Sequence, residues 1–369
     1  MTENKDKKVL NVPNIRFPEF KEEWKKQNLE SITSSVSSGK SHAADGEYNL
    51  YGSTGIIGKT DNGAYEGNLV LVARVGANAG YLQIINEKCG ITDNTLVITP
   101  RQISARYIYN YLQHFNLNCL IFGSGQPLIT GSMLKNVSIS FGTYEEQNKI
   151  ATFLSLLDER IATQNKIIEE LKQLKNGIIE KQYKNVFNNC RLGDVIKQTS
   201  IRNKNKAITN ILSVNNKLGF INQREQFEDR IIASDDISNY KIVEKKHFAY
   251  NPARINVGSI AQLKTFESGI VSPMYICFKT QNNIDSDYLE YYFSTLLFKK
   301  EVQKRLEGSV RLCLSYESLC NIPFFVPNID EQKRISRELS LLSSKINIED
   351  CYLSILEKQK QYLLRQMFI

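Results

Sequence analysis

The sequence lacks several features that would assign it to a familiar class of protein. It has no run of about 18 apolar residues, so we expect no membrane-spanning helix. Its start, MTENKDKKVLNVPN, carries charges but no apolar stretch after them, unlike a secretory signal. The seven cysteines are odd in number and include no Cys-x-x-Cys pair, so we expect reduced thiols in a cytoplasmic protein.

Motifs for nucleotide, metal and catalytic chemistry are also missing. The three histidines lie far apart, without the spacing of metal ligands. The stretch GSTGIIGKT at 52–60 ends like a phosphate-binding loop, but the position where that loop needs a glycine is Ser53. Glu244 and Lys246 after Asp236 resemble a nuclease-like set, yet this run reads more simply as a solvated turn entering a strand. We therefore predict a chain with no catalytic residue, no metal site and no cofactor of its own.

The formal charge of +8 is not spread evenly. Residues 1–143 hold 14 basic and 12 acidic side chains, and residues 188–329 hold 19 basic and 14 acidic ones. The remaining stretches, 144–187 and 330–369, are nearly balanced. A basic excess of this size permits a polyanionic partner such as nucleic acid but does not by itself require one.

What the sequence does contain is a long internal repeat. Laid without a gap over residues 330–368, residues 145–183 are identical at ten positions. The two copies open alike, with EQNKIATFLSLL and EQKRISRELSLL, 185 residues apart. Shared helix composition alone would give fewer matches in one ungapped alignment, so the repeat is the main organising feature of the chain.

Each copy has the spacing of a coiled coil, with apolar residues at the first and fourth positions of successive heptads. Only Gly177 interrupts the first copy, and neither glycine nor proline interrupts the second. Five heptads exceed the length of an ordinary globular helix, although a plain amphipathic helix packed on a core would show a similar stripe. The predicted coiled-coil seam consists of Ile150, Leu154, Leu157, Ile161, Gln164, Ile168, Leu171, Ile178, Ile335, Leu339, Leu342, Ile346, Glu349, Leu353, Leu356 and Leu363.

The order of the segments constrains how the two helices pair. If they are antiparallel partners, residues 188–329 lie at one end of the pair and residues 1–143 at the other. Polar residues interrupt the seam at the middle of each helix, at Gln164 and Glu349. We expect this polar pair to lie close together and to fix the helix register at some cost in stability.

The two long segments between the helices also repeat, though weakly. Each carries a strand-like run that ends in Ala-Arg, within 69–80 and 248–259, and then an aromatic helix candidate, at 106–112 and 287–293. Between these anchors the sequences differ freely, and the stretch 37–67 has no counterpart in the second segment. A shared frame with different loops indicates two versions of one module that present different binding surfaces.

Together these features resemble the specificity subunit of a type I restriction–modification enzyme. The resemblance rests on VPNIRFPEFKEEW at 12–24, on the phrases YGSTGIIGKTDN and VLVARVGANAG, on the two helix openings and on the closing LLRQMFI. It covers essentially the whole chain. One departure is that prolines precede the second helix, at Pro323 and Pro327, but not the first.

The resemblance implies an α/β (α+β) fold with a pseudo-twofold repeat. The predicted parts are target recognition domain 1 at 1–143, conserved coiled-coil helix 1 at 144–187, target recognition domain 2 at 188–329 and conserved coiled-coil helix 2 at 330–369. Each recognition domain would read one half of a split sequence in double-stranded DNA, as the halves of a dimeric reader do. The antiparallel helices would set the distance between the halves and dock two methyltransferase subunits.

The resemblance also implies where the chemistry lies. The methyltransferase subunits would bind S-adenosylmethionine and methylate adenine, and motor-nuclease subunits that use ATP and Mg would join them for cleavage. The chain itself would be a non-catalytic subunit without a membrane partner.

Candidate DNA contacts follow from side-chain chemistry. Phosphates are bound by Lys, Arg, hydroxyl and amide donors, and base edges favour Arg, Lys, Asn and Gln. Arg74 and Arg254 recur at matching places, which a shared structural salt bridge would explain equally well. The candidates in the first domain are Lys40, His42, Tyr51, Ser53, Lys59, Arg74, Asn78 and Gln126. Those in the second are Arg202, Lys204, Asn215, Asn216, Lys217, Arg254, Asn256 and Arg311.

Two other classes of function fit parts of the sequence. A scaffold whose two modules bind protein or carbohydrate would use the coiled coil equally well. A self-contained DNA-modifying enzyme would need a methyl-donor loop or a catalytic motif, and we find neither. DNA binding and methyl transfer by the purified chain separate these classes.

Overall fold

The strand and helix patterns of the sequence reappear in the computed structural model. The model describes residues 11–121, 125–184, 188–216, 218–223, 236–308 and 311–369. The two strand-like runs become β5 (Asn68–Ala73) and β15 (Phe248–Tyr250), and the two aromatic segments become α2 (Ala105–Phe115) and α6 (Ser286–Ser294). Leu69 to Ala73 are all buried, as expected for a central strand that is covered on both faces. These four predictions are confirmed.

The chain divides into two units. Unit 1 contains residues 1–166 and 350–369, and unit 2 contains residues 167–349. Each unit therefore holds one of the two modules together with part of each long helix. The division into four sequence segments stays a prediction. Within the described residues, no helix is both long enough and apolar enough to cross a membrane.

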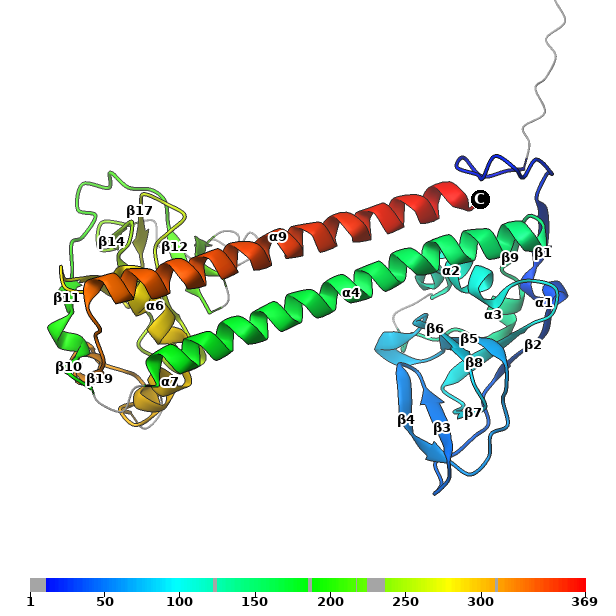
Figure 1. Ribbon diagram of the computed structural model, residues 1–369, viewed down its shortest axis with the longest axis horizontal. Helices are drawn as coiled ribbons and strands as arrows, with labels where there is room; N and C mark the ends of the chain where they lie inside the picture. The colour runs from blue at the N-terminus through cyan, green and yellow to red at the C-terminus, as the bar shows by residue number, and fades with distance from the viewer. Residues whose placement is uncertain (1–10, 122–124, 185–187, 217, 224–235, 309–310) are drawn as a thin grey trace, which may run out of the picture. The chain divides into compact units, whose positions relative to one another are not determined.

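Unit 1 is built on a four-stranded antiparallel sheet in the order β2-β8-β5-β6. A second sheet has the order β4-β3-β7, in which β3 and β7 are parallel, and β1 pairs with β9. Figure 1 shows α2 between the four-stranded sheet and the start of the first long helix. The further elements of this unit are β1 (Lys25–Asn28), α1 (Leu29–Ile32), β2 (Thr33–Ser38), β3 (Tyr48–Gly52), β4 (Gly55–Thr60), η1 (Gly76–Asn78), β6 (Leu82–Asn86), β7 (Cys89–Ile91), β8 (Thr95–Pro100), η2 (Leu117–Leu120), α3 (Gly131–Lys135) and β9 (Ser138–Phe141).

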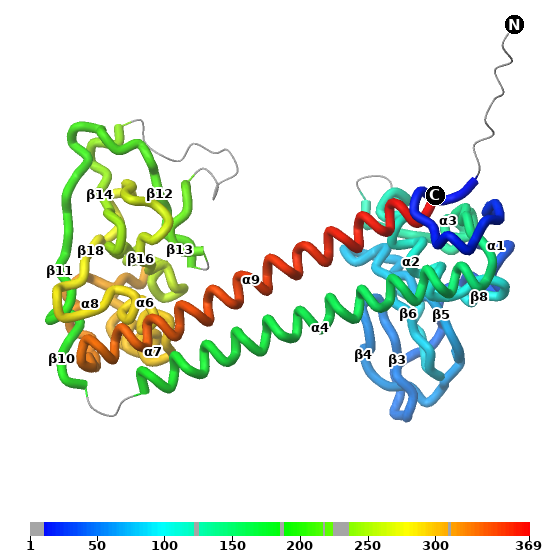
Figure 2. The backbone as a smooth tube through the Cα atoms, turned by 45° about the horizontal axis from the view of Figure 1, so that its top comes forward, coloured from blue at the N-terminus to red at the C-terminus, as the bar shows by residue number. Residues whose placement is uncertain are grey.

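Unit 2 repeats the central sheet of unit 1. Its strands have the order β11-β18-β15-β16 and are also antiparallel, whereas the second sheet is replaced by two separate pairs, β12-β13 and β14-β17. Figure 2 shows β12 and β14 farther from α6 and α7 than β16 and β18. The further elements of this unit are β10 (Cys190–Arg191), η3 (Leu192–Asp194), β11 (Ile196–Thr199), β12 (Leu212–Asn215), β13 (Gly219–Asn222), β14 (Lys241–Glu244), η4 (Ile255–Val257), β16 (Ile260–Gln262), β17 (Ser268–Val271), β18 (Ile276–Thr280), α7 (Leu296–Gln303), α8 (Tyr316–Cys320) and β19 (Pro323–Phe324).

The repeated segments form two long helices, α4 (Tyr144–Tyr183) and α9 (Ile329–Met367). In unit 1, Lys360 of α9 makes an ion pair with Asp158 of α4, and Arg160 lies over the ring of Tyr352. The beginning of α4 therefore packs along the end of α9, which makes the two helices antiparallel. The predicted α+β architecture with antiparallel helices is confirmed.

The sixteen seam residues are buried or half-buried, and none of them is exposed. Large apolar residues outside the seam, such as Leu341 and Ile348, stay largely exposed, at 64% and 63% of their surface. The heptad pattern thus selects the covered face of each helix. Gln164 is 5% exposed. It lies in unit 1 and Glu349 in unit 2, so their proximity remains a prediction.

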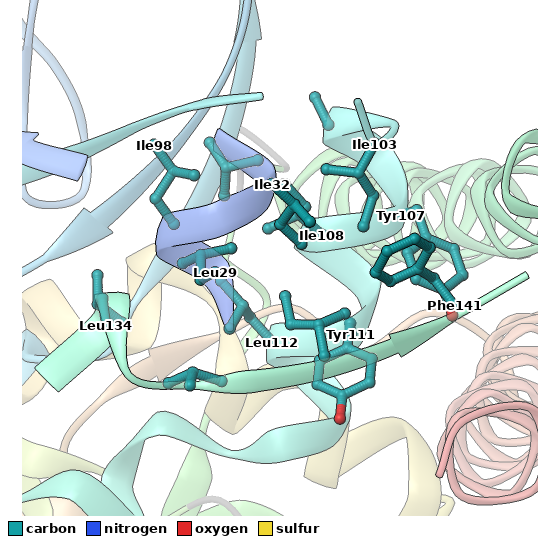
Figure 3. Close-up of a cluster of buried hydrophobic side chains, with 14 of the residues drawn as sticks. Leu29, Ile32, Ile98, Ile103, Tyr107, Ile108, Tyr111, Leu112, Leu134 and Phe141 are labelled. Carbon is teal, nitrogen blue, oxygen red and sulfur yellow. The ribbon is translucent and has the colours of Figure 1, made fainter. Parts of the chain in front are cut away.

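A single hydrophobic cluster joins the first module to its helices. Leu29, Ile32, Ile98 and Ile108 form part of this cluster between α1, the sheet and α2 (Figure 3). The apolar residues of α2 recur at helical spacing on one face, which explains why this segment forms a helix and buries that face. Phe368, near the end of the chain, packs on two tyrosine rings of the same helix.

Those two tyrosines attach α2 to strand β9. The hydroxyl of Tyr107 donates to the backbone oxygen of Ser140 at 2.7 Å, and the hydroxyl of Tyr111 donates to that of Ser138 at 3.0 Å. Buried tyrosines need such acceptors because an unpaired hydroxyl in an apolar core is costly. The short strand and the helix are thereby held at a fixed distance.

Unit 2 uses the same device with different residues. Tyr183 packs on the rings of Tyr288 and Tyr292, as Phe368 does on the tyrosines of unit 1. The hydroxyls of Tyr288 and Tyr292 donate to the backbone oxygens of Phe325 and Pro323. These acceptors lie 185 residues after their counterparts in β9, which is the offset of the helix repeat. The two modules therefore share the same aromatic contacts and tyrosine hydrogen bonds, although their sequences resemble each other only weakly.

Candidate nucleic-acid interface

A glutamine at the start of each long helix fixes that helix to its module. The side chain of Gln147 accepts from the backbone N–H of Ser104 at 3.0 Å and donates to the oxygen of Gly142 at 3.1 Å. Gln332 accepts in the same way from Asp285 at 2.7 Å. Ser104 and Asp285 are the N-cap residues of α2 and α6. Both glutamines are buried, so each module is oriented by a matched pair of internal hydrogen bonds.

The module held in this way gathers several predicted DNA contacts at one end of its sheet. The backbone N–H of Arg74 and the hydroxyl of Ser53 both donate to the backbone oxygen of Asn94, at 3.0 and 3.3 Å. The exposed Asn78 closes the η1 turn that follows Arg74. The backbone N–H of Gly76 donates to Pro127, which places the exposed Gln126 beside this turn.

The guanidinium of Arg74 makes few hydrogen bonds within the described part of the chain. Its Nη1 donates weakly to the oxygen of Asp93 at 3.5 Å, and its buried Nε has no hydrogen-bond partner among the described residues. Within the described part of the chain, neither Arg74 nor Arg254 takes part in an ion pair. The structure therefore provides no support for the shared salt bridge that the sequence left open.

Tyr51 and Lys59 belong to a separate network on the hairpin of β3 and β4. The hydroxyl of Tyr51 donates to the carboxylate of Glu87, and burial together with this bond raises the pKa of Tyr51 to about 12. Asn49 donates to the same carboxylate and accepts from the amine of Lys59 at 2.9 Å. Tyr51 thus has its hydroxyl engaged within the fold, and the network stiffens the hairpin. Lys40 and His42 lie before this hairpin and are exposed.

In unit 2, three predicted asparagines line one cleft. Asn215, Asn216 and Asn256 lie around a cleft of about 800 Å³, which is bounded by the η4 turn, α6, α7 and the parts of α4 and α9 that belong to this unit. Arg254 is exposed at the N-cap of η4, which follows β15 as η1 follows β5. The recurrence of an arginine before this turn is therefore a structural correspondence.

The remaining candidates of the second module lie elsewhere. Arg202 is exposed and donates to the side-chain oxygen of Asn239 at 3.2 Å. Lys204 and Arg311 are exposed. Lys217 lies outside the described residues.

Sequence reasoning missed the residues that orient the modules. Glu146 is fully buried and accepts from Arg16 Nε at 2.7 Å and from Trp24 Nε1 at 3.0 Å. The identity of Glu146 and Glu331 across the repeat marked this position, but nothing in the pattern showed that Arg16 and Trp24, 130 and 122 positions earlier, cover only the first copy. Lys175, which is identical to Lys360 in the repeat, was not among the predicted contacts, although its side chain lines the cleft of unit 2.

Comparisons with known proteins agree with this architecture. Residues 5–173 match the family model described as type I restriction modification DNA specificity domain. The type I restriction enzyme MjaVIII specificity subunit of Methanocaldococcus jannaschii is 24% identical over 332 residues, which cover 80% of this chain and 77% of that protein. The MjaIX specificity subunit of the same organism is 26% identical over 335 residues, with 82% and 77% covered.

Solved structures show the same fold over nearly the whole chain. The crystal structure of the type I restriction–modification system S subunit from M. genitalium aligns with a TM-score of 0.62 at 18% identity, covering 97% of this chain and 99% of that one. A second chain, from a study of complex assembly and conformational transition of the type I R-M system, aligns with a TM-score of 0.55 at 13% identity, covering 92% and 96%. Residues 5–173 are thus similar to the DNA specificity domain of type I restriction–modification systems, and the relatives that align with most of the chain are specificity subunits of such enzymes.

Proposed function

We propose that this protein reads a two-part sequence in double-stranded DNA, with each recognition domain contacting one half. The observation that carries this proposal is the repeated frame with unlike loops. Both modules have the same central sheet and are attached to the long helices by matched glutamines, whereas the second sheets differ. Two readers that are each attached to a long helix in the same way suit a target with two half-sites.

We further propose that the antiparallel helices set the spacing of the half-sites and dock two methyltransferase subunits. The catalytic groups would then belong to those partners, which would bind S-adenosylmethionine, and to motor-nuclease subunits that use ATP and Mg. The present chain would act without a cofactor of its own, in the cytoplasm. The candidate contacts that best fit DNA recognition are those that the fold leaves exposed, among them Asn78, Gln126 and Arg254.

A methylation assay tests this function. The purified chain, its methyltransferase subunits and their complex are each incubated with host DNA and a labelled methyl donor. We expect methylation of one bipartite motif by the complex only, and a gel shift of DNA that carries that motif. Methyl transfer by the chain alone would show a self-contained enzyme, and a complex without DNA binding would favour a scaffold for protein or carbohydrate.

A further inference from the structure

The cleft of unit 2 carries more positive than negative charge. Its charged lining consists of Lys175, Lys264, Lys299 and Glu290. Lys264 is neutralised within the fold, because its amine makes ion pairs with Glu290 and, at 3.1 Å, with Asp287. No described residue forms an ion pair with Lys175 or Lys299. The cleft therefore presents two amines whose charge is not balanced by a direct carboxylate contact.

Lys175 is the more unusual of the two because it is half-buried. Its amine lies 5.6 Å from the centre of the Tyr291 ring, whose face attracts the charge. Burial lowers the pKa of Lys175, and the nearby Glu290 opposes this effect. A cation withdrawn from water in this way is stabilised when an anion comes into contact with it.

The internal repeat shows what Lys175 lacks. Its counterpart 185 residues later is Lys360, which is 2.5 Å from the carboxylate of Asp158 in unit 1. The residue that corresponds to Asp158 in the second copy is Ser343. Ser343 lines the cleft, and its hydroxyl donates to the backbone oxygen of Leu339 at 2.8 Å. The same lysine thus faces a carboxylate in one half of the protein and an open cleft in the other.

We infer that this cleft binds a backbone phosphate of the target DNA, which takes the place of the missing carboxylate beside Lys175. The inference rests on the proposed function and adds a long helix to the DNA-contacting surface. Lys299, from α7, supplies a second amine, and the exposed amides of Asn216 and Asn256 supply neutral donors. Lysine and amide donors are common partners of DNA phosphates.

The decisive variant is Ser343→Asp, which gives Lys175 the carboxylate that Lys360 has. Affinity for the target is measured with the complex of the full chain and its methyltransferase subunits between 50 and 200 mM salt. Losing one phosphate contact should lower the slope of log affinity against log salt by about 0.9, and should weaken binding at 50 mM salt by about tenfold. Lys175→Gln should give a similar change, and the methylated bases should stay the same.

Two matched variants control for a change in net charge and for a substitution on either long helix outside the cleft. Gln361→Glu adds a carboxylate at an exposed position of α9, and Lys181→Gln removes an exposed amine of α4; neither residue lines the cleft. Both should leave the salt slope as in the unaltered complex. Ser343→Asp should also keep its melting temperature, because the new carboxylate faces a lysine.

Amine labelling of the unaltered complex provides a second measurement, which no effect of a substitution on folding can influence. Target DNA should protect Lys175 from an amine-reactive reagent, whereas inorganic phosphate at equal ionic strength should protect it much less. Protection by inorganic phosphate together with an unchanged DNA affinity of Ser343→Asp would overturn the inference in favour of a free anion. If the unaltered complex binds no DNA, the proposed function itself fails; if it binds and Ser343→Asp matches Gln361→Glu, only this inference fails.

Discussion

Replacing Glu146 by alanine should destabilise unit 1 strongly, while the same change at its repeat counterpart should not. Glu146 has no exposed side-chain surface, and it accepts from both Nε and Nη2 of Arg16, at 2.7 and 2.9 Å, and from Trp24. Arg16 is only 13% exposed, and its pKa is raised by the hydrogen bonds to Glu146. Removing the carboxylate leaves a nearly buried guanidinium and an indole N–H without their acceptor.

The expected loss is about 3–5 kcal/mol, the usual cost of removing one partner of a buried ion pair. With an m-value of about 2 kcal/mol per M in urea, the unfolding midpoint should fall by about 1.5–2.5 M. Trp24 is the only tryptophan, so its fluorescence reports unit 1, and circular dichroism of the helices reports the whole chain.

The matched control is Glu331→Ala. Glu331 is half-buried, and among the described residues its carboxylate bonds to the neighbouring surface residue Arg334, so its loss should move neither transition measurably. Equal shifts for Glu146→Ala and Glu331→Ala would show that the N-terminal segment does not stabilise unit 1 through this cluster. An unchanged Trp24 transition in Glu146→Ala would refute the reasoning as well.

Three further predictions concern the attachment of the modules, the buried thiol of Cys277 and the length of the helices. Gln147→Leu and Gln332→Leu should each cost about 2–4 kcal/mol in urea unfolding, because each leaves a backbone N–H and a carbonyl unpaired; a loss in only one of them would contradict the matched docking. Burial raises the pKa of the Cys277 thiol to about 12, so only about one molecule in three thousand carries this thiol as a thiolate at pH 8.5. Iodoacetamide should therefore label the exposed Cys351 far faster than Cys277. Equal rates in the native chain would contradict this, and unfolding should abolish the difference. Inserting seven residues in the middle of both α4 and α9 adds roughly 10 Å of helix, which corresponds to about three base pairs of DNA. The preferred spacer between the half-sites should lengthen by that amount, and the half-site bases should stay unchanged. An unchanged spacer with full activity would show that another element sets the distance.

The sequence was most informative where a pattern repeats locally. The heptads predicted which face of each long helix is covered, because a period of 3.5 residues fixes that face whatever the partner is. The strand-like runs and aromatic segments were also identified, since burial on both faces and helical spacing leave a direct mark on composition. These predictions needed no knowledge of distant contacts.

Contacts between distant residues were beyond such reasoning. Tyr51 was chosen as a DNA contact for its hydroxyl, but Glu87, 36 residues later, already accepts from that hydroxyl. The identity of Lys175 and Lys360 was visible in the alignment, whereas the difference between their surroundings depends on which residue of the opposing helix meets each of them. Side-chain pairing of this kind follows from the fold and not from the local pattern.

Exchanging the first recognition domain tests the central claim most directly. Residues 29–143 are replaced by the corresponding domain of another specificity subunit whose target is known, and the methylated motif of the resulting complex is read by methylation-aware sequencing. The account predicts that one half of the motif changes to the donor's half-site while the other half stays as it was. A change in both halves, or in neither, would contradict the model of two separate readers.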